Sequence, residues 1–584
     1  MAEFDLVVRG GTICDGAGGE PFDGDVAISG GKIARVGKVS GSGAEEIDAK
    51  GKLVTPGFVD IHTHYDGQIT WAERMQPSSL HGVTTVVMGN CGVGFAPCKP
   101  DQHDLMIRVM EGVEDIPGIV LAEGIPWKWE TFPEYLDFIG KRHADVDFAA
   151  QVPHAPVRVY VMGKRGAERE PAMAGDIAKM SAIVKEGIEA GALGFSTSRS
   201  ILHRLKDGQL APTITVNEDE LTGIARGLKE ANRGVLQFID DFNDAMAEAS
   251  ASLAMWRRLA EESGRPVSFN LAQNPFWETG LSLHVLDYIS QANNDGLRMK
   301  AQVCNRPIGA LFSLESSTHA FAFSPTFRAM AGLTHAQRIA EMRKPEVRAK
   351  LLVETPSDPN MRLVEWVRDF DHVYPLGDPP NYSPKPEHSV GARARARGLD
   401  PLAFVYDALM EKDGRSILYY PITNFQAGNF DELHKIIAHP HSVQGIADGG
   451  AHLGMICDAS APTHMLTHWT RDRQDGPRMP IGWAVRELSS ATAAVVGLAD
   501  RGLLKPGYKG DLNVIDYDHM RLYPPQVIAD LPAGGRRFMQ KADGYVATVL
   551  SGEVTYREGQ ATKALPGRLV RGTQAAPSVR PQAA

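Results

Sequence analysis

Short apolar segments alternate with amphipathic segments through the middle of the chain, a pattern typical of buried parallel strands that are each followed by a helix. Eight segments have the length and composition of buried strands: 58–61, 84–89, 147–152, 192–196, 234–239, 266–271, 298–304 and 442–447. Helical patterns occupy 175–190, 217–232, 244–263 and 281–293. This order predicts an α/β protein built on a (β/α)8 barrel, in which functional residues lie at the carboxyl ends of the strands.

The two ends of the chain instead carry short strand-like runs separated by glycine-containing turns, as in β-hairpins. Neither end can bury a stable core alone, so we expect both to join in one small β-sandwich. The predicted domains are therefore 1–55 and 501–572 for the sandwich and 56–500 for the barrel.

Two further segments depart from the barrel pattern. The interval of about 306–424, between the seventh and eighth predicted strands, is longer than a single barrel helix requires. It predicts an insertion subdomain over the barrel mouth, where substrate selectivity would be set. Residues 573–584 are rich in Pro, Ala and Gln and are predicted to form a disordered tail.

Composition restricts the class of function. The formal net charge of −10 argues against general nucleic-acid binding, because that function uses a basic face. The sequence has neither a long apolar run nor a basic segment followed by an apolar one, so we expect no membrane span and no export signal. Five scattered cysteines predict no disulfide framework and suit a reducing cytoplasm. The expected partner is a small-molecule substrate, and the sequence leaves the oligomeric state open.

Candidate metal ligands follow three of the predicted strands. His62 and His64 end the first strand, and side chains at i and i+2 share a face, so both imidazoles can reach one metal ion. Cys91 follows the second strand and could add a thiolate deprotonated by the cation, although a small buried residue is the alternative interpretation. Asp448 follows the eighth strand and could act as a ligand and general base, although an Asp before Gly-Gly is also a common turn residue.

Longer motifs extend this interpretation over nearly the whole chain. The segments 90–97 (NCGVGFAP), 191–197 (GALGFST) and 501–507 (RGLLKPG) resemble motifs of the N-acyl-D-amino-acid deacylases, or D-aminoacylases, of the amidohydrolase superfamily. The resemblance implies a β-sandwich beside a metal-bearing barrel, zinc as the usual metal, and hydrolysis of an N-acyl amide. It implies metal-binding roles for His62, His64 and Cys91, and the role of catalytic carboxylate for Asp448.

The sequence departs from the family pattern at the fifth and sixth strands. The family has a histidine on each, whereas 237–241 and 268–273 contain none, and the lysine expected after the sixth strand is missing. We weigh two arrangements of the metal site. The favoured one uses His62, His64, Cys91 and Asp448, a complete set of four ligands. In the other, Asp240 replaces the fifth-strand histidine as an oxygen ligand.

Three further residues are candidates for the reaction itself. His154 follows the third strand and is the candidate for stabilising the oxyanion of the transition state. Asn270 on the sixth strand and Arg306 after the seventh are the candidate substrate-binding residues. A structural or surface role is the alternative for any single histidine.

Three functions remain open at this point. The first is a metal-dependent hydrolase that cleaves N-acyl-D-amino acids or related small amides, with a divalent ion, expected to be Zn²⁺, activating water. The second is a divergent amidohydrolase acting on a cyclic amide, a lactone or another carbonyl compound, which the missing histidines and lysine would suit. The third is a non-catalytic binding protein on a degenerated barrel. Metal content of the purified protein would separate the enzymes from the binding protein.

Overall fold

A closed barrel of parallel strands forms the centre of the computed structural model, which describes residues 2–242, 245–356 and 361–578. Its strands are β6 (Phe58–Asp60), β7 (Val83–Met88), β8 (Asp147–Ala150), β9 (Val152–Pro153), β10 (Gly194–Ser198), β11 (Val235–Ile239), β12 (Val267–Asn270), β13 (Met299–Val303) and β17 (Ser442–Gln444). They pair in the orders β6-β7-β8 and β9-β10-β11-β12-β13-β17. A parallel bridge between Thr63 and Gly449 joins the two ends of this series. The predicted barrel is confirmed.

Each barrel strand is buried on both faces, which explains why the strands appear in the sequence as continuous apolar runs. All six residues of β7 and all five of β10 are buried. The helices between and after these strands include α2 (His103–Val113), α3 (Gly118–Gly124), α4 (Phe132–Ile139), α5 (His154–Met162), α7 (Ala174–Ala190), α8 (Glu218–Ala231), α9 (Met246–Ser263), α10 (Leu281–Asn294), α17 (Asp431–Ile437), α19 (Ile481–Leu488) and α20 (Ser490–Val495).

Local differences from the expected elements have identifiable causes. The predicted third strand is divided at Gln151 into β8 and β9, which pair with different neighbours. The eighth strand ends at Gln444 because Ile446 and Asp448 adopt left-handed φ angles of 56° and 48°, which turn the chain out of the sheet. Asp448 therefore lies in a loop. The predicted start of the third helix, at 244, is outside the described residues, and α9 begins at Met246.

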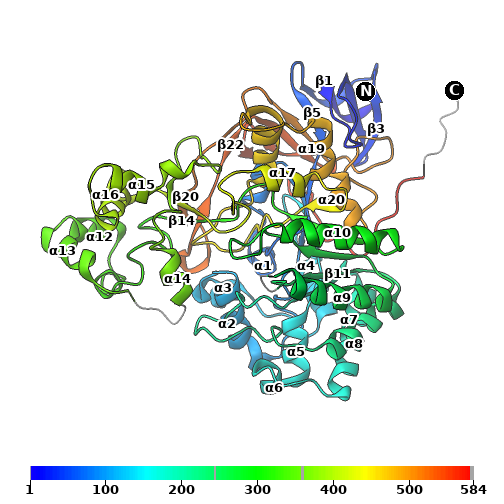
Figure 1. Cartoon of the computed structure of the whole chain (residues 1–584). Coiled ribbons are helices and arrows are strands. Elements are labelled where there is room, and N and C mark those ends of the chain that lie inside the picture. The colour runs from blue at the N-terminus through cyan, green and yellow to red at the C-terminus, as the bar shows by residue number, and fades with distance from the viewer. Residues whose placement is uncertain (1, 243–244, 357–360, 579–584) are drawn as a thin grey trace.

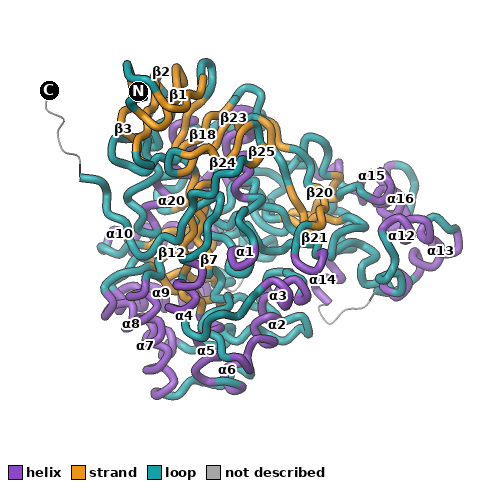
Figure 2. The backbone as a smooth tube through the Cα atoms, turned by 180° about the vertical axis from the view of Figure 1, so that it is seen from behind, coloured by secondary structure: helices purple, strands orange, loops and turns teal. Residues whose placement is uncertain are grey.

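Segments from both ends of the chain share one sheet, at the top of Figures 1 and 2. The N-terminal strands are β1 (Phe4–Ile13), β2 (Phe22–Ser29), β3 (Lys32–Gly37), β4 (Gly43–Asp48) and β5 (Leu53–Pro56), and the C-terminal ones are β18 (Leu512–Ile515), β23 (Tyr545–Leu550), β24 (Glu553–Arg557) and β25 (Gln560–Ala561). The antiparallel pair β5–β18 joins the two groups, with Val54 opposite Val514. The expected association of the two ends is present, and the exact domain boundaries stay predictions.

The long interval between β13 and β17 forms a body with its own apolar core. It contains the antiparallel strands β14 (Gly309–Phe312), β15 (Tyr374–Pro375) and β16 (Leu418–Pro421), with α11 (Pro325–Arg328), α12 (His335–Met342), α13 (Pro345–Val353), α14 (Met361–Trp366), α15 (Val390–Ala396) and α16 (Pro401–Gly414). Its strands contact the loop after β17, where the Leu311 amide donates to the Met455 carbonyl over 2.8 Å. Figure 1 shows α12, α13, α15 and α16 extending to the left, away from α7–α10. The Ser317 amide also donates to the Gly454 carbonyl over 2.8 Å, so this body contacts the loop that carries Asp448, and its position over the barrel mouth stays a prediction.

Residues 573–578 of the predicted disordered tail form ordered contacts, whereas the predicted disorder of 579–584 falls outside the described residues. Gln574 forms a parallel bridge with Leu498, and its amide donates to the Gly497 carbonyl over 2.9 Å. These backbone bonds hold the first residues of the predicted tail against the turn that follows α20. Among the described residues, no helix has both the length and the apolar composition needed to cross a bilayer.

Candidate metal centre

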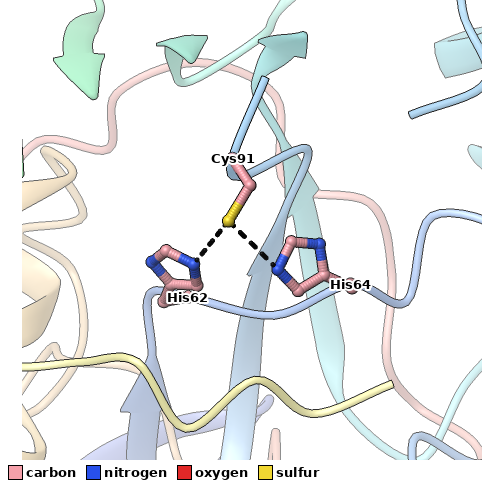
Figure 3. A group of neighbouring side chains, drawn as sticks. All are labelled: His62, His64 and Cys91. Atoms are coloured by element: carbon pink, nitrogen blue, oxygen red, sulfur yellow. Dashed lines mark hydrogen bonds between the residues drawn. The ribbon is translucent and has the colours of Figure 1, made fainter. Parts of the chain in front are cut away.

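Three predicted ligands converge at the carboxyl end of the barrel (Figure 3). The Cys91 sulfur lies 3.3 Å from His62 Nε2 and 3.5 Å from His64 Nε2. Sulfur and nitrogen ligands at zinc bond lengths around a tetrahedral centre lie about 3.5 Å apart. All three residues are buried. The group therefore has the spacing of a metal site.

Asp448 adjoins this group on the side of the two histidines. Its Oδ1 lies 3.4 Å from His62 Nε2 and 3.8 Å from His64 Nε2. The compact group whose donor atoms all lie within 4.8 Å of one another consists of His62, His64 and Cys91. Three of the four predicted ligands thus form the group itself, and the fourth, Asp448, lies beside the two histidines of the group.

Backbone contacts hold the segment after β6 against the loop after β17. The His64 amide donates to the Gly449 carbonyl over 2.8 Å, and the Asp448 amide donates to the His62 carbonyl over 3.2 Å. A Cβ atom at Gly449 would lie only 2.3 Å from Ser78 Oγ, so the loop requires glycine to approach this closely. The close approach brings the Asp448 carboxylate beside the histidines.

Polar contacts also position Cys91, which has a left-handed φ of 57° directly after β7. The neighbouring Asn90 side chain donates to the Thr63 carbonyl over 3.1 Å and so connects the loops after β6 and β7. The Gly92 amide donates to Ser196 Oγ over 3.0 Å. Anchored on both sides, the thiol faces the two imidazoles (Figure 3).

The outer nitrogens of the two imidazoles differ in their surroundings. His62 Nδ1 donates to Gln302 Oε1 over 2.8 Å, whereas His64 Nδ1 forms no hydrogen bond among the described residues and lies 3.4 Å from the carboxylate oxygen Oε1 of Glu114. A partner at Nδ1 selects the tautomer whose Nε2 lone pair is free for a metal. Neither Gln302 nor Glu114 is among the predicted site residues. Gln302 is a polar residue within an apolar strand, which is a usable signal, whereas Glu114 follows α2 without any motif.

The unsatisfied groups of the site fit a divalent cation. Asp448 Oδ1 is buried and has no hydrogen-bond partner among the described residues. Burial raises the pKa of Asp448 well above its usual range, and the charges of Asp458 and Asp60 add to the rise. Burial and the charge of Asp448 also raise the pKa of Glu114. A cation would compensate this concentration of buried carboxylates.

The protonation of the ligands agrees with that fit. Burial lowers the pKa of His62 to about 4 and that of His64 well below its usual value, so both imidazoles are neutral and able to bind metal at neutral pH. Burial raises the pKa of the Cys91 thiol well above its usual value, and the charges of Glu114, Asp448 and Asp66 contribute. The thiolate form therefore needs a cation beside it.

The alternative ligand Asp240 has other partners. Its Oδ2 accepts hydrogen bonds from Ser252 Oγ over 2.6 Å and from Trp256 Nε1 over 2.9 Å. Both donors lie on α9, which packs outside the barrel. The structure does not bring Asp240 into the metal-ligand group, so its role as a replacement ligand stays a prediction that this geometry does not favour.

Both ring nitrogens of His154 likewise have hydrogen-bond partners. Its Nδ1 pairs with Thr197 Oγ1 at 2.8 Å and its Nε2 with Glu220 Oε1 at 3.0 Å. Glu220 also accepts a hydrogen bond from Arg158 Nε over 2.9 Å. Because neither ring nitrogen is free, contact between His154 and an oxyanion would require these bonds to break. The catalytic role of His154 stays a prediction, and its observed contacts are structural.

Neutral polar side chains occupy the fifth and sixth strands, where the sequence lacks the family's histidines. Gln237 Nε2 donates to Asn270 Oδ1 over 3.2 Å, and Gln302 Nε2 donates to Ser268 Oγ over 3.0 Å. Gln302 in turn contacts His62, so the hydrogen-bonded pair of Gln302 and Ser268 adjoins the metal-ligand group. Asn270 is therefore inside the barrel, and its role toward substrate stays a prediction.

Arg306 is fully buried at the end of the seventh strand. Its Nη2 lies 2.7 Å from Asp458 Oδ1, and its guanidinium stacks 4.0 Å from the ring centroid of Tyr382. Nε and Nη1 have no hydrogen-bond partner among the described residues. The ion pair gives Arg306 a structural role, and substrate binding through its other two nitrogens stays a prediction.

Comparison with known proteins agrees with this geometry. The amidohydrolase family model matches residues 45–556. A D-aminoacylase of Alcaligenes xylosoxydans xylosoxydans is 26% identical over 579 residues, covering 98% of each chain. An N-acyl-D-aspartate deacylase of the same organism is 26% identical over 523 residues, covering 88% of this chain and 86% of its own.

A solved structure shares the fold. The N-acyl-D-glutamate deacylase of Bordetella bronchiseptica, complexed with zinc and a phosphonate inhibitor, superposes with a TM-score of 0.65 at 20% identity, covering 97% of this chain and 99% of that one. The family match includes every barrel strand from β6 to β17, and it includes β5, β18 and β23 of the terminal sheet but not β1, β2 or β3. The resemblance found in the sequence motifs is confirmed, and the chain belongs to the amidohydrolase family.

Proposed function

We propose that this chain is a metal-dependent hydrolase that cleaves the amide bond of N-acyl-D-amino acids or related small amides. One observation carries the proposal: His62, His64 and Cys91 converge at the carboxyl end of the barrel, with an unpartnered oxygen of Asp448 beside them. The relatives named D-aminoacylase and N-acyl-D-aspartate deacylase support this substrate class over a cyclic amide or a lactone. A non-catalytic binding protein would need no such donor set.

Asp448 is the proposed proton carrier. A cation bound at the site would polarise the scissile carbonyl and lower the pKa of the attacking water to about 7. The Asp448 carboxylate accepts a proton from this water as the water oxygen forms its bond to the carbonyl carbon. The carboxyl then donates the proton to the departing nitrogen as the carbon–nitrogen bond breaks. The products are a carboxylate and a free amino acid.

Zinc is the proposed metal, with one ion per chain. Two imidazole nitrogens and one thiolate form a donor set that zinc prefers. Gln237, Ser268 and Asn270 are the polar side chains on the two strands where the family has histidines, and none of them is an imidazole, which supports a single ion. All five cysteines are free and buried, which suits the proposed cytoplasmic location.

Metal content is the first test. The purified protein should contain about one equivalent of zinc, and the His62→Ala variant should contain far less while retaining its circular dichroism spectrum. Replacing His441, a partly buried histidine beyond the amino end of β17, with Ala is the matched control and should leave the metal content unchanged. A wild-type protein without any divalent metal after metal supplementation would contradict the proposal.

A substrate screen is the second test. The zinc-supplemented enzyme should release free amino acid from N-acetyl and longer N-acyl D-amino acids, with the L-enantiomers as controls. Hydantoins and lactones tested in parallel address the alternative substrates. Hydrolysis of cyclic substrates alone would contradict the proposed substrate class. If the metal-loaded protein hydrolysed none of these compounds, the proposed hydrolase activity would be contradicted.

A further inference from the structure

A cleft lies at the amino ends of the barrel strands, at the opposite end of the barrel from the metal centre. It has a volume of about 660 Å³, within the range of small-molecule sites. Residues at the starts of β12, β13 and β17 form its floor, and α19 and α20 form one wall. Asn293 at the end of α10 lies on the opposite side. Figures 1 and 2 both show α20 beside α10 at this end of the barrel.

The separation from the metal centre follows from strand direction. Lys300 lines the cleft near the start of β13, whereas Gln302 contacts His62 toward the end of the same strand. The lining contains none of the residues that form the metal-ligand group. The cleft is therefore a distinct site on the other end of the barrel.

Positive charge exceeds negative charge in this cleft. Its lining includes Arg298, Lys300 and Arg486 but a single carboxylate, that of Glu487. Arg486 Nη2 lies 2.7 Å from Glu487 Oε1, and the charge of Glu487 also acts on Lys300, so the three cations exceed the one carboxylate by two charges. Among the described residues, neither Arg298 nor Lys300 has an ion-pair partner. Lys300 Nζ donates to the Pro440 carbonyl over 2.5 Å, and Arg298 Nη2 donates to the Gly264 carbonyl over 3.4 Å.

A buried hydroxyl group in the lining also lacks a partner. Ser442, at the start of β17, is 5% exposed, and its Oγ has no hydrogen-bond partner among the described residues. A buried hydroxyl without a partner is unfavourable, so such groups are normally satisfied by protein, water or ligand. The Ser442 oxygen is itself buried, so this unmet hydrogen bond lies beside the cleft and not on its open surface.

The remaining lining is apolar and includes one aromatic ring. Trp483 on α19 is partly exposed and lines the cleft, and Val443 of β17 and Val495 of α20 also line it. Tryptophan combines a large apolar surface with a stacking face, which suits a planar ligand. The cleft thus presents cations and an apolar surface together.

We propose that this cleft binds a small organic anion: a carboxylate, sulfonate or phosphate group attached to an apolar or aromatic body. Arg298 and Lys300 bind the anionic group, and the body packs against Trp483. This site is independent of the hydrolysis proposed for the metal centre, because the two sites share no lining residue.

The probe for the test is 8-anilinonaphthalene-1-sulfonate, which joins an aromatic body to an anion. Isothermal titration calorimetry with the zinc-loaded protein should show saturable binding below about 1 mM. Arg298→Gln should weaken this binding at least tenfold, and Ala494→Trp, which adds bulk from the exposed cleft face of α20, should do the same. Arg395→Gln, on α15 in the insertion, is the matched control and should bind like the wild type.

Two comparisons separate the contributions of charge and apolar surface. The uncharged analogue N-phenyl-1-naphthylamine and inorganic sulfate should each bind at least tenfold more weakly than the probe. The proposal is overturned if the wild type shows no saturable binding up to about 1 mM, or if both cleft variants bind like the wild type. Arg298 and Ala494 are both exposed, so the variants should fold, and either one decides the result if the other does not.

Discussion

His62 Nδ1 lies 2.8 Å from Gln302 Oε1 inside the barrel, and this contact directs His62 Nε2 toward the Cys91 sulfur 3.3 Å away. Gln302 is itself held by its bond to Ser268. A neutral amide thus selects the histidine tautomer at the metal centre, a task that a carboxylate or a carbonyl performs in many metal sites. The first prediction tests this relationship.

Replacing Gln302 with Leu should weaken zinc binding by about 10–100-fold, because His62 loses the partner that fixes its ring. Gln302→Glu retains an acceptor and should recover much of the affinity. Competition with a chelator measures the zinc dissociation constant of each variant. Equal affinities for Gln302→Leu and the wild type would show that the contact does not orient the ligand.

Glu114 should act on His64 in the same way. Its Oε1 lies 3.4 Å from His64 Nδ1, and its backbone carbonyl accepts the amide of His452. Glu114→Gln should lower zinc affinity by about tenfold, because the charged acceptor beside the imidazole is lost. Glu111→Gln, one turn earlier on α2 and paired with Lys206 at the surface, is the control and should have no effect.

Asp448→Asn should lower kcat by about 10²–10⁴-fold, because it removes the proton carrier. The retained amide oxygen should keep most of the zinc, since His62, His64 and Cys91 remain. Metal analysis and turnover of the same preparation separate the two effects. The surface variant Asp472→Asn should behave like the wild type, and near-normal turnover of Asp448→Asn would remove the proton-carrier role.

Arg306→Leu should destabilise the protein by about 3–5 kcal/mol, because it leaves Asp458 buried without its partner. The double variant Arg306→Leu/Asp458→Leu should recover much of this loss. Urea denaturation measures the free energy of unfolding of each variant. A loss below about 1 kcal/mol would contradict a structural ion pair, and KM values of the folded variants test the predicted substrate contact of Arg306.

Glu220 should contribute a pH-dependent part of the stability. Burial tends to raise its pKa, but its hydrogen bonds and charge interactions with His154 and Arg158 outweigh burial and lower it. A lowered folded pKa means that the contribution is present above the unfolded value of about 4.3 and is lost as pH falls through the folded value. Glu220→Gln should therefore be less stable than the wild type at pH 7, and the difference should shrink in acid.

Urea unfolding of both proteins between about pH 7 and pH 3.5 measures this change across the relevant range. Glu230→Gln, at an exposed position of the same helix, should follow the wild type at every pH. A constant stability difference between Glu220→Gln and the wild type across this range would contradict the assigned pKa direction.

The barrel and the main ligands follow from the sequence alone for a local reason. A buried parallel strand is apolar throughout, and the residue that follows it lies at the carboxyl end of the barrel whatever the rest of the fold does. His62, His64 and Cys91 immediately follow such strands, so their convergence needs no knowledge of distant segments. Asp448 also could be identified, although its strand ends earlier than its sequence indicates.

Only the tertiary structure decided which polar groups face that centre. Glu114 reaches His64 from the end of α2, and Gln302 reaches His62 across the barrel from a position 240 residues later in the chain. His154 and Asp240 also follow strands, but Glu220 and α9 engage their side chains. Sequence position determines where a residue enters the barrel, whereas the direction and partners of its side chain depend on packing between segments that are distant in the sequence.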